Sequence, residues 1–285
     1  MQTPHIFVII LSYNGRHLTE ACVRSCLDSD FTSFTIVLVD NASPDGSGDY
    51  LKEKFNSEIH SGKIKYIGNE ANLGFAGGNN VGIQYALNNN ADAVLLLNND
   101  TVMDKKCLVH LSEGLAHYPQ AGILGPKIYY FEPNDQIWFA GAEFKLYKGT
   151  ARHIGIREKE NLQYEEAKTS DYITGCAMLI RCDVFKSVPG LDTSYHMYSE
   201  DVDFCFRAKQ AGFELVYIPQ AKIWHKISAS TGGQLSLRKI RLRFFSNMKL
   251  LIKYARWYHW LTIPFYFFAD LMRIAFRILT GAIRN

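Results

Sequence analysis

Short and almost unbroken apolar runs recur along the first part of the chain, and segments of mixed polarity separate them. Such runs are typical of parallel β-strands that are buried on both faces. The segments between them place apolar residues at helical spacing, and Asp45-Gly46-Ser47 and Tyr118-Pro119 supply a helix start and a helix stop. The pattern predicts strands at 6–11, 35–39, 64–67 and 93–97 and helices at 17–29, 46–56, 76–88 and 105–117.

This alternation of strands and helices predicts βαβ units and an α/β fold built on an open parallel sheet. The regularity weakens over residues 131–170, which include the highly charged stretch 158–168. We interpret this segment as an irregular insertion or a lid near a site, and a solvated surface loop is the alternative. Regular patterning returns as a strand-like run at 172–181, a helix around 200–211 and a strand at 214–218.

The last part of the chain, residues 236–285, is helical by pattern and rich in basic and aromatic residues. Its longest uncharged stretch, 257–269, has 13 residues, whereas a spanning helix needs about 20, so no transmembrane helix is expected. Charged side chains instead form two stripes at helical spacing beside an aromatic cluster. Such helices suit the interface of a bilayer, and packing on the domain or on a second subunit is the alternative. The stripes are Asp270, Arg273, Arg277 and Arg284, and Lys249, Lys253 and Arg256, and the aromatic residues are Trp257, Tyr258, Trp260, Phe265, Tyr266, Phe267 and Phe268.

The charge of the chain is distributed unevenly. The 285 residues carry a formal net charge of +3, which disfavours a dedicated nucleic-acid-binding protein. Residues 236–285 contain ten Lys and Arg against one acid, a net charge of +9, so the rest of the chain is at −6. The charge pattern therefore predicts an acidic domain at 1–235 and a basic helical tail at 236–285.

Six cysteines are present, and none forms a C-x-x-C pair. The first apolar run has no basic segment before it and no small-residue cleavage site after it, so no signal peptide is expected. These features favour reduced structural thiols in a cytoplasmic protein.

Polar clusters follow all four strands predicted in the first part of the chain. In an open α/β sheet ligands bind beyond the carboxyl ends of the strands, so these clusters indicate a candidate site. Asp40 can accept hydrogen bonds from a nucleobase or a ribose, and Asp100 can ligate a hard divalent cation that bridges phosphates. Turn formation is the alternative use of these residue types. The clusters are Ser12-Tyr13-Asn14-Gly15, Asp40-Asn41-Ala42-Ser43, residues 72–80, and Asn98-Asn99-Asp100-Thr101.

The cluster at 72–80 is rich in glycine. Gly74, Gly77 and Gly78 would let the backbone approach a ligand closely. The segment is not a phosphate-binding P-loop, because no Gly-Lys-Ser/Thr follows, and it does not match G-x-G-x-x-G.

Two further features lie near the end of the acidic domain. Glu200, Asp201 and Asp203 open a predicted helix, and acids at a first helical turn are also favoured by the helix dipole alone. His225 follows the last predicted strand, where it is either a ligand or a satisfied structural residue.

In this order and at these spacings, the motifs resemble the inverting family 2 glycosyltransferases with a GT-A fold, from about Ile6 to Ser230. The stretches VIILSYN (8–14) and VLVDNAS (37–43) resemble that family's first two strand ends, and LLNND (96–100) resembles its D-x-D-type metal motif. YSEDVDFCFR (198–207) resembles its catalytic helix. NLGFAGGNN (72–80), TGCAMLIR (174–181) and Trp224-His225 further resemble the rhamnosyltransferase-like branch.

The resemblance implies a Rossmann-like, mostly parallel sheet flanked by helices in a catalytic domain at 1–235, followed by amphipathic helices at 236–285. It also implies inverting transfer of a sugar from a nucleoside-diphosphate donor to a lipid-linked or polysaccharide acceptor in cell-surface glycan synthesis. The typical donor of the branch is dTDP-L-rhamnose. The protein would be cytoplasmic and peripheral on the inner face of the cell membrane, and a homodimer is left open.

The resemblance also carries roles over to single residues. Asp201 is expected to be the base that takes the proton of the acceptor hydroxyl, and Glu200 to orient the acceptor or the base, or to be the base itself. Asp100 is expected to hold Mg²⁺ or Mn²⁺, and His225 to complete the metal or phosphate site. Asn98 stands where the metal motif has an Asp, which predicts weaker metal affinity. The expected donor-binding residues are Asp40, which reads the base, Gly175, which lines the sugar pocket, and Ser12, Asn14, Asn72, Gly74, Gly77 and Asn98.

Two other functions stay open on the residues alone. A catalytically silent subunit that binds a nucleotide-sugar or a glycan on the same fold is favoured by Asn98 and disfavoured by the presence of both Glu200 and Asp201. A nucleotidyltransferase would need a Gly-rich loop with Lys or Arg directly after the first strand, and Ser12-Tyr13-Asn14-Gly15-Arg16 fits that requirement poorly.

Overall fold

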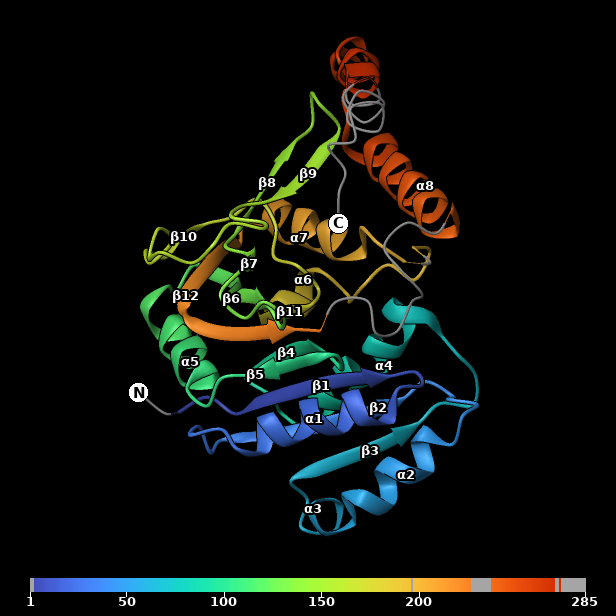
Figure 1. Ribbon diagram of the computed structural model, residues 1–285, viewed down its shortest axis with the longest axis vertical. Coiled ribbons are helices and arrows are strands. Elements are labelled where there is room, and N and C mark those ends of the chain that lie inside the picture. Colours follow the sequence, from blue (N-terminus) through green and yellow to red (C-terminus); the bar gives the residue numbers. More distant parts are fainter. Residues whose placement is uncertain (1–2, 196, 227–236, 270–271, 273–285) are drawn as a thin grey trace.

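The four strands predicted in the first part of the chain form one half of a large sheet. The computed structural model describes residues 3–195, 197–226, 237–269 and 272. The four strands are β1 (Ile6–Ser12), β2 (Phe34–Asp40), β3 (Ile64–Gly68) and β4 (Ala93–Asn98). They are parallel neighbours in the order β4-β1-β2-β3 (Figure 1). Most of their apolar side chains are buried, as the unbroken apolar runs predict.

The helices between these strands cover both faces of the sheet. They are α1 (Arg16–Leu27), α2 (Ser47–Lys54), α3 (Asn56–His60), α4 (Gly74–Asn88) and α5 (Cys107–His117), and they confirm the four predicted helical segments. On one face α4 lies so close to β1 that a Cβ at Gly78 would sit 2.4 Å from a methyl carbon of Leu11. On the other face the hydroxyl groups of Ser12 and Thr19 join β1 to α1 at 3.0 Å. Successive side chains of a strand point to opposite faces, which is why the neighbours Leu11 and Ser12 contact different helices.

The other half of the sheet is mixed in direction. It contains β5 (Thr101–Met103), β6 (Ala121–Tyr130), β7 (Ile137–Phe139), β10 (Lys168–Thr169), β11 (Ala177–Arg181) and β12 (Glu214–His225). β11 runs antiparallel between β4 and β6, and β12 runs parallel to β6. The pattern did not predict β6. The strand predicted at 214–218 continues to His225, because β12 resumes its pairing with β6 after a register shift between Ile218 and Lys222.

The segment 131–170 is more regular than its weak periodicity predicts. Besides β7 and β10 it contains a separate hairpin, in which β8 (Ala142–Lys145) pairs antiparallel with β9 (Thr150–His153). The buried amino group of Lys127 on β6 anchors the segment, since it pairs with Glu160 at 2.9 Å and Glu165 at 2.5 Å. The expectation of an irregular insertion is therefore wrong for the β8–β9 hairpin, whereas residues 154–167 lie outside helices and strands. Partners that are distant in sequence order this segment, and such partners leave no local pattern.

The tail is helical, as predicted, and packs on the α/β domain. The remaining helices are α6 (Val184–Ser187), α7 (Glu200–Gln210), α8 (Leu237–Tyr254) and the 3₁₀ helix η1 (Trp257–Leu261), and residues 263–269 are also helical. Leu250, Leu251 and Ile263 of the tail are buried. The packing on the domain corresponds to one of the two arrangements that the pattern left open.

Two lysines of one basic stripe contact the domain, whereas Arg256 of the same stripe is exposed. The amino group of Lys253 pairs with Asp203 of α7 at 2.6 Å, and that of Lys249 contacts Ser194 and lies 4.3 Å from the centre of the Tyr195 ring. Both lysines therefore face the domain and not a lipid surface. The residues 270, 273, 277 and 284 of the other stripe lie outside the described part of the chain.

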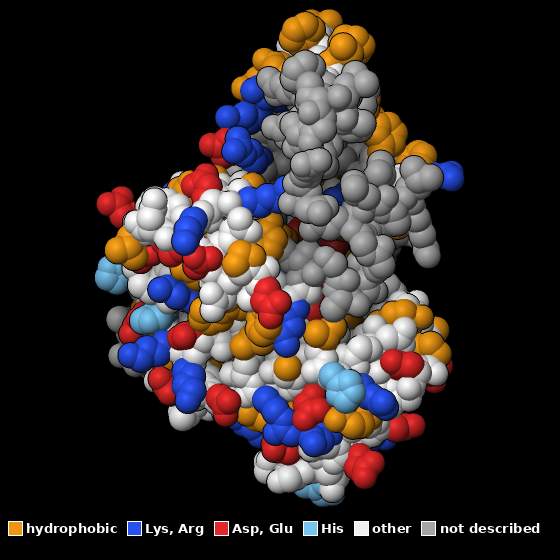
Figure 2. Space-filling model, in the orientation of Figure 1, with side chains coloured by type: hydrophobic (Ala, Val, Ile, Leu, Met, Phe, Trp, Pro, Cys, Tyr) orange, Lys and Arg blue, Asp and Glu red, His pale blue; other side chains and the backbone are white. Residues whose placement is uncertain are grey.

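The opposite side of the tail exposes large apolar side chains. Trp257 is 78% exposed, Leu261 73% and Phe265 71%. Figure 2 shows hydrophobic side chains gathered over this end of the molecule, with Lys and Arg side chains beside them. Among the described helices, none is both long and apolar enough to cross a bilayer.

All six cysteines are free, as expected. Five of them are buried, and Cys182 is half-buried. Burial raises the pKa of Cys107 and raises that of Cys182 to about 12, so these thiols stay protonated and unreactive at neutral pH.

Candidate active site

The polar clusters meet at one edge of the sheet. Ser12 is paired with Asp40, Asp40 with Gly68, and Leu11 with Asn98 in the ladders between the parallel strands. These strands therefore end in register, and the segments that follow them lie side by side. This is the edge at which open α/β sheets bind their ligands.

Asp40 is held rigidly at the end of β2. Its Oδ1 accepts a hydrogen bond from the Ser43 hydroxyl at 2.6 Å, and its Oδ2 accepts one from the Ser43 N–H at 3.2 Å. Ser43 Oγ in turn accepts from the Asn14 N–H at 2.9 Å, which joins the first two clusters. A Cβ at Gly48 would lie 2.7 Å from Asp40 Oδ2, so this approach to the carboxylate requires glycine. Asp40 thus has a defined orientation for accepting hydrogen bonds.

Ser12 has a structural role. Its side chain is fully buried, and its hydroxyl is bonded to that of Thr19. Thr19 Oγ1 also accepts a hydrogen bond from Asn99 Nδ2 at 2.9 Å. Ser12 therefore helps to connect the first cluster with the fourth, and its side chain does not face the edge.

Asn41 organises the segment after β3, although no sequence pattern singled it out. Its Nδ2 donates to Asn72 Oδ1 at 2.9 Å and to the Gly74 carbonyl at 3.2 Å. Its Oδ1 accepts from the Leu73 N–H and from Asn69 Nδ2, both at 3.0 Å. Asn72 Oδ1 also accepts from the Gly74 N–H at 2.8 Å. These bonds bring the third cluster to the same edge. The Asn72 side chain stabilises the loop that contains it.

The glycines of the third cluster are required by packing. Gly74 begins α4 with φ +70°, in the left-handed region that favours glycine. A Cβ at Gly77 would lie 2.8 Å from Leu73 Cβ, and one at Gly78 would collide with Leu11. A contact between these glycines and a ligand stays a prediction.

Asp100 and His225 form a buried pair beyond β4. Asp100 is 8% and His225 9% exposed, and His225 Nε2 lies 3.1 Å from Asp100 Oδ1. Asp100 Oδ1 and His225 Nδ1 are buried, and neither has a hydrogen-bond partner among the described residues. Burial opposes the charge of His225, but the neighbouring Cys176 sulfur and the Asp100 carboxylate raise the pKa of His225 to about 10.

This pair can hold a divalent cation in part. A buried carboxylate oxygen without a donor is a fitting ligand for Mg²⁺ or Mn²⁺, and imidazole accepts Mn²⁺. Within the described ranges, no three His, Cys, Asp or Glu side chains gather into a group that could hold a metal by themselves. A cation at Asp100 therefore needs ligands from outside the protein, as Mg²⁺ commonly takes from substrate phosphates.

Glu200 and Asp201 begin α7 in different surroundings. Asp201 accepts hydrogen bonds from the Gly175 N–H and the Val202 N–H, both at 2.8 Å. Glu200 is 7% exposed, and its Oε2 is buried without a described hydrogen-bond partner. Burial and the charge of Asp201 raise the pKa of Glu200 to about 8. Burial also raises the pKa of Asp201, and the bonds from the two N–H groups oppose that rise.

The third acid of this helix, Asp203, faces away from the edge. It is fully buried, and Lys253, Arg207 and the hydroxyl of Tyr254 contact its carboxylate at 2.6–2.9 Å. Asp203 belongs to the same sequence motif as Glu200 and Asp201. Only its contacts in the folded protein show that it has different surroundings.

A match to a known protein family shows which family the chain belongs to. A family model described as glycosyl transferase family 2 matches residues 7–188. The chain belongs to this family. Residues 7–188 contain all four polar clusters and Gly175. Glu200, Asp201 and His225 lie beyond the matched range.

Two relatives of this family 2 chain illustrate its range. N-acetylglucosaminyl-diphospho-decaprenol L-rhamnosyltransferase of Mycobacterium tuberculosis is 25% identical over 246 residues, which are 79% of this chain and 77% of that one. The uncharacterized protein y4gI of Sinorhizobium fredii is 25% identical over 249 residues, which are 85% of this chain. The chain spans only 26% of the length of that second relative.

A solved structure supports the family at the level of the fold. The mannosyltransferase PcManGT from Pyrobaculum calidifontis, in complex with GDP-Man and Mn²⁺, superposes with a TM-score of 0.68 at 14% identity. The alignment covers 100% of this chain and 77% of that chain. The expected GT-A fold of this family 2 protein is thereby confirmed.

Proposed function

We propose that this family 2 protein transfers a sugar, with inversion, from a nucleoside-diphosphate donor to a lipid-linked or polysaccharide acceptor. One observation carries the proposal. The dipeptide Gly175-Cys176 is bonded on one side to Asp201, through the Gly175 N–H, and on the other to Asn98, whose N–H donates to the Cys176 carbonyl at 2.9 Å. A single displacement at a sugar carbon needs a base on one side of the carbon and a site for the leaving diphosphate on the other. The dipeptide holds the proposed base and the proposed diphosphate site on its two sides.

The donor occupies the edge formed by the polar clusters. Asp40 accepts hydrogen bonds from the base or the ribose, in the orientation that Ser43 imposes. Asn14 and the loop that contains Asn72, Gly74 and Gly77 enclose the nucleotide. The sugar lies toward Gly175, where a Cβ would be 3.2 Å from Asp201 Cβ and 3.5 Å from the Phe75 ring. A side chain at this position would fill space that the sugar needs.

The proton of the acceptor hydroxyl goes to Asp201. Its two N–H donors stabilise a negative charge, whereas Glu200 has no donor and a pKa of about 8. Near neutral pH the proton of the pair therefore resides on Glu200, and Asp201 is ionised. As the new bond from the acceptor oxygen to the anomeric carbon forms, the bond to the diphosphate breaks, and Asp201 takes the hydroxyl proton. Glu200, still protonated, donates a hydrogen bond that orients the acceptor.

Asp100 and His225 face the leaving group. Together with Asn98 they would hold Mg²⁺ or Mn²⁺, and such a cation, when bound, supplies positive charge at the developing diphosphate. His225 must give up its proton to bind it. Because this site has a single carboxylate, such a cation would depend more on the donor's own phosphates.

The sequence motifs, a relative and the tail together support a particular sugar, acceptor and location. The rhamnosyltransferase-like motifs and the name of the mycobacterial relative support dTDP-L-rhamnose as the donor and a lipid-linked acceptor in cell-surface glycan synthesis. The exposed apolar side of the tail supports a peripheral position on the inner face of the cell membrane. A homodimer through the same side is the alternative.

A donor screen on the purified protein tests the proposal. We expect one nucleotide-sugar to raise the melting temperature, more so with Mn²⁺, and to release nucleoside diphosphate when the acceptor is added. Asp201→Asn should lower turnover by about 10²-fold or more and keep the melting shift caused by the donor. Asp135→Asn, at an exposed position paired with Lys159, is the control.

Each part of the proposal has its own contrary result. Near-normal turnover of Asp201→Asn would remove Asp201 from the role of base. Release of pyrophosphate would identify a nucleotidyltransferase. Donor binding without any transfer or hydrolysis, across acceptors and metals, would leave a silent binding subunit.

A further inference from the structure

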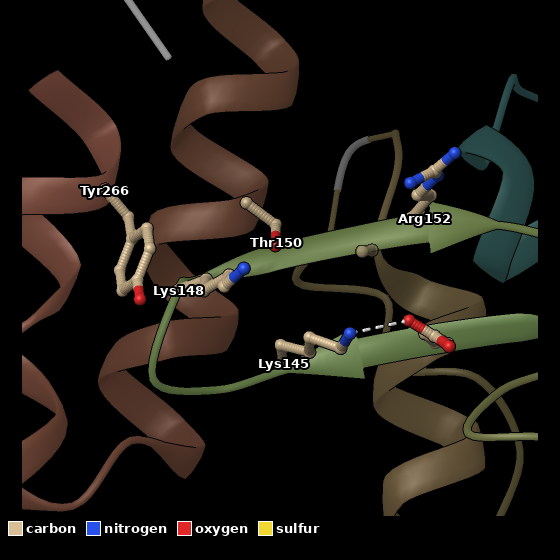
Figure 3. Close-up of a pocket in the computed structure, with 7 residues that line it drawn as sticks. Lys145, Lys148, Thr150, Arg152 and Tyr266 are labelled. Atoms are coloured by element: carbon tan, nitrogen blue, oxygen red, sulfur yellow. Dashed lines mark ion pairs between the residues drawn. The ribbon is translucent and has the colours of Figure 1, made fainter. Parts of the chain in front are cut away.

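A basic pocket lies between the β8–β9 hairpin and the tail, apart from the edge that the clusters form. It has a volume of about 370 Å³, and its lining is Glu143, Lys145, Lys148, Thr150, Ala151, Arg152 and Tyr266. Figure 3 shows Lys145, Lys148 and Arg152 along the hairpin and Tyr266 reaching toward Lys148 from the tail. The proposed function makes no use of this pocket.

The pocket carries positive charge that its own residues do not neutralise. Lys145 pairs with Glu143 at 2.9 Å, and Glu143 is the only acid in the lining. Lys148 and Arg152 have no acidic partner within 4.0 Å among the described residues. The Lys148 amino group instead lies 4.9 Å from the centre of the Tyr266 ring, a cation–π contact that leaves its N–H donors available. With the hydroxyl groups of Thr150 and Tyr266, the pocket offers hydrogen-bond donors and two surplus cations.

Contacts with both helices of the tail hold the hairpin in place. The Thr262 hydroxyl donates to the Tyr147 carbonyl at 2.6 Å, and Asn247 Nδ2 donates to the Gly149 carbonyl at 3.1 Å. A Cβ at Gly149 would lie 3.0 Å from a methyl carbon of Leu251. The tip of the hairpin is therefore fixed against the tail, and the pocket is a built feature of that junction.

The base of the same hairpin reaches the helix of the proposed base. The Phe144 ring packs edge-on against Phe206 of α7 at 5.2 Å, and the Phe144 N–H donates to Asp171 Oδ2 at 2.9 Å. Asp171 is four residues before Gly175. The hairpin thus connects the catalytic edge with the exposed apolar side of the tail, where Phe265 directly precedes Tyr266 of the pocket.

We propose that this pocket binds the phosphates of the lipid that carries the acceptor sugar. Phosphate oxygens are recognised by Lys and Arg through charge-assisted hydrogen bonds, and hydroxyl groups add neutral donors. The apolar chain of such a lipid would leave along Phe265 and Leu261, while the sugar extends along the hairpin toward Asp201. This assignment rests on the proposed function, because only a transferase with a lipid-linked acceptor has this ligand.

Vesicle flotation measures the binding without relying on catalysis. Neutral phosphatidylcholine vesicles contain either undecaprenyl diphosphate or phosphatidylglycerol at equal total charge. We expect the wild type to prefer the diphosphate vesicles, and Lys148→Gln combined with Arg152→Gln to weaken that binding at least about tenfold while binding to the phosphatidylglycerol vesicles changes little. Lys105→Gln combined with Lys106→Gln removes the same charge from exposed positions at the start of α5 and should preserve the preference.

Three results would overturn the assignment. The first is an unchanged preference in the pocket variant. The second is an equal loss of binding on both kinds of vesicle, which would indicate an ordinary anionic headgroup. The third is the same loss of binding in the α5 control. A separate readout distinguishes failure of the pocket from failure of the proposed function. Transfer to a soluble alkyl glycoside without phosphate should be the same in the wild type and the pocket variant. If neither protein transfers sugar, the proposed function fails while the binding result still decides the pocket.

Discussion

Glu200 and Asp201 are adjacent in sequence, yet their surroundings give them different protonation behaviour. Asp201 accepts two backbone hydrogen bonds, and Glu200 accepts none at its buried Oε2. A buried carboxyl without donors favours its neutral form, and the charge of the neighbour strengthens that preference. The proposed separation of roles between base and orienting acid therefore rests on backbone N–H groups, whose positions α7 and Gly175 determine.

The raised pKa of Glu200 predicts a pH dependence of stability. The folded protein holds a proton on Glu200 up to a pH of about 8, whereas the unfolded chain releases it near the ordinary value of 4.5. Between pH 5 and 8 the folded state binds more protons, so this group makes the free energy of unfolding fall as the pH rises. Glu200→Gln removes this contribution, and its stability relative to the wild type should increase from pH 5 to pH 8.

Urea denaturation at pH 5, 6.5 and 8 measures this difference. Glu143→Gln, at an exposed position on the hairpin, is the matched control and should show a constant difference from the wild type. If the Glu200→Gln and wild-type stabilities run parallel over this range, the buried proton on Glu200 does not exist.

At the scale of secondary-structure elements, α7 joins the catalytic edge to the tail. Asp201 and Asp203 are two residues apart, which is about 200° around a helix, so their side chains leave on opposite sides. Asp201 is bonded to Gly175, and Asp203 is bonded to Lys253 of α8. The Ser246 hydroxyl of α8 also donates to the Met197 carbonyl, just before α7, at 2.8 Å. The tail is therefore part of the support of α7, the helix that carries the proposed base.

Removing the amino group of Lys253 should destabilise the protein. Asp203 is fully buried and would lose one of its cations, but Arg207 and Tyr254 would still contact it. We expect Lys253→Gln to lower the free energy of unfolding by about 1–2 kcal/mol, less than the loss of a sole partner of a buried charge. Lys186→Gln, at an exposed position on α6, should change it by less than about 0.5 kcal/mol.

Chemical denaturation checks this value, and activity adds a second readout. A loss of stability in Lys253→Gln no larger than in Lys186→Gln would mean that the tail does not support α7. Turnover of Lys253→Gln measured well below its denaturation midpoint should fall as well, because the N-terminal turn of α7 carries the proposed base.

At the scale of the whole molecule, the near-zero net charge is the sum of an acidic domain and a basic tail. Part of that basic charge is directed at the domain, since the amino groups of Lys253 and Lys249 contact it. What faces outward on the described tail is mainly apolar, and large apolar side chains gathered in one place are uncommon on a monomeric surface. Deleting the tail would therefore remove the support of α7 together with the proposed membrane contact, so single side chains make the better test.

The exposed aromatic residues should determine binding to a membrane. Trp257→Ser combined with Phe265→Ser should lower partitioning into anionic vesicles at least about tenfold, because burying each aromatic side chain is worth about 1.5–3 kcal/mol. Vesicle co-sedimentation at low salt measures the partitioning. Leu162→Ser combined with Ile156→Ser replaces exposed apolar residues of the insertion and is the control.

Unchanged partitioning of the aromatic variant would exclude this contact with lipid. Analytical ultracentrifugation then tests the alternative, because loss of a dimer in the same variant would assign the apolar side to a second copy of the chain.

The order of the first four strands and their helices, and the clusters at the ends of these strands, follow from the sequence alone. Strand burial on both faces requires unbroken apolar runs, and helix starts and stops are local chemistry, so both leave patterns along the chain. The parallel pairing of the first four strands also places Asp40 and Asp100 at one edge without further information. The sequence therefore determined the fold class, the location of the site and the residue types available to it.

Only the tertiary structure decided how those residues divide their tasks. Ser12 packs between β1 and α1, Asn41 binds the loop after β3, and Asp203 pairs with the tail. Each of them is hydrogen-bonded to a residue that is 7 to 50 positions away in the chain. Within segment 131–170 the order also comes from distant partners: the tail contacts the tip of the β8–β9 hairpin, and the buried Lys127 holds Glu160 and Glu165. Burial and hydrogen bonding depend on what the folded chain brings together, and a one-dimensional pattern contains only what a residue's near neighbours impose.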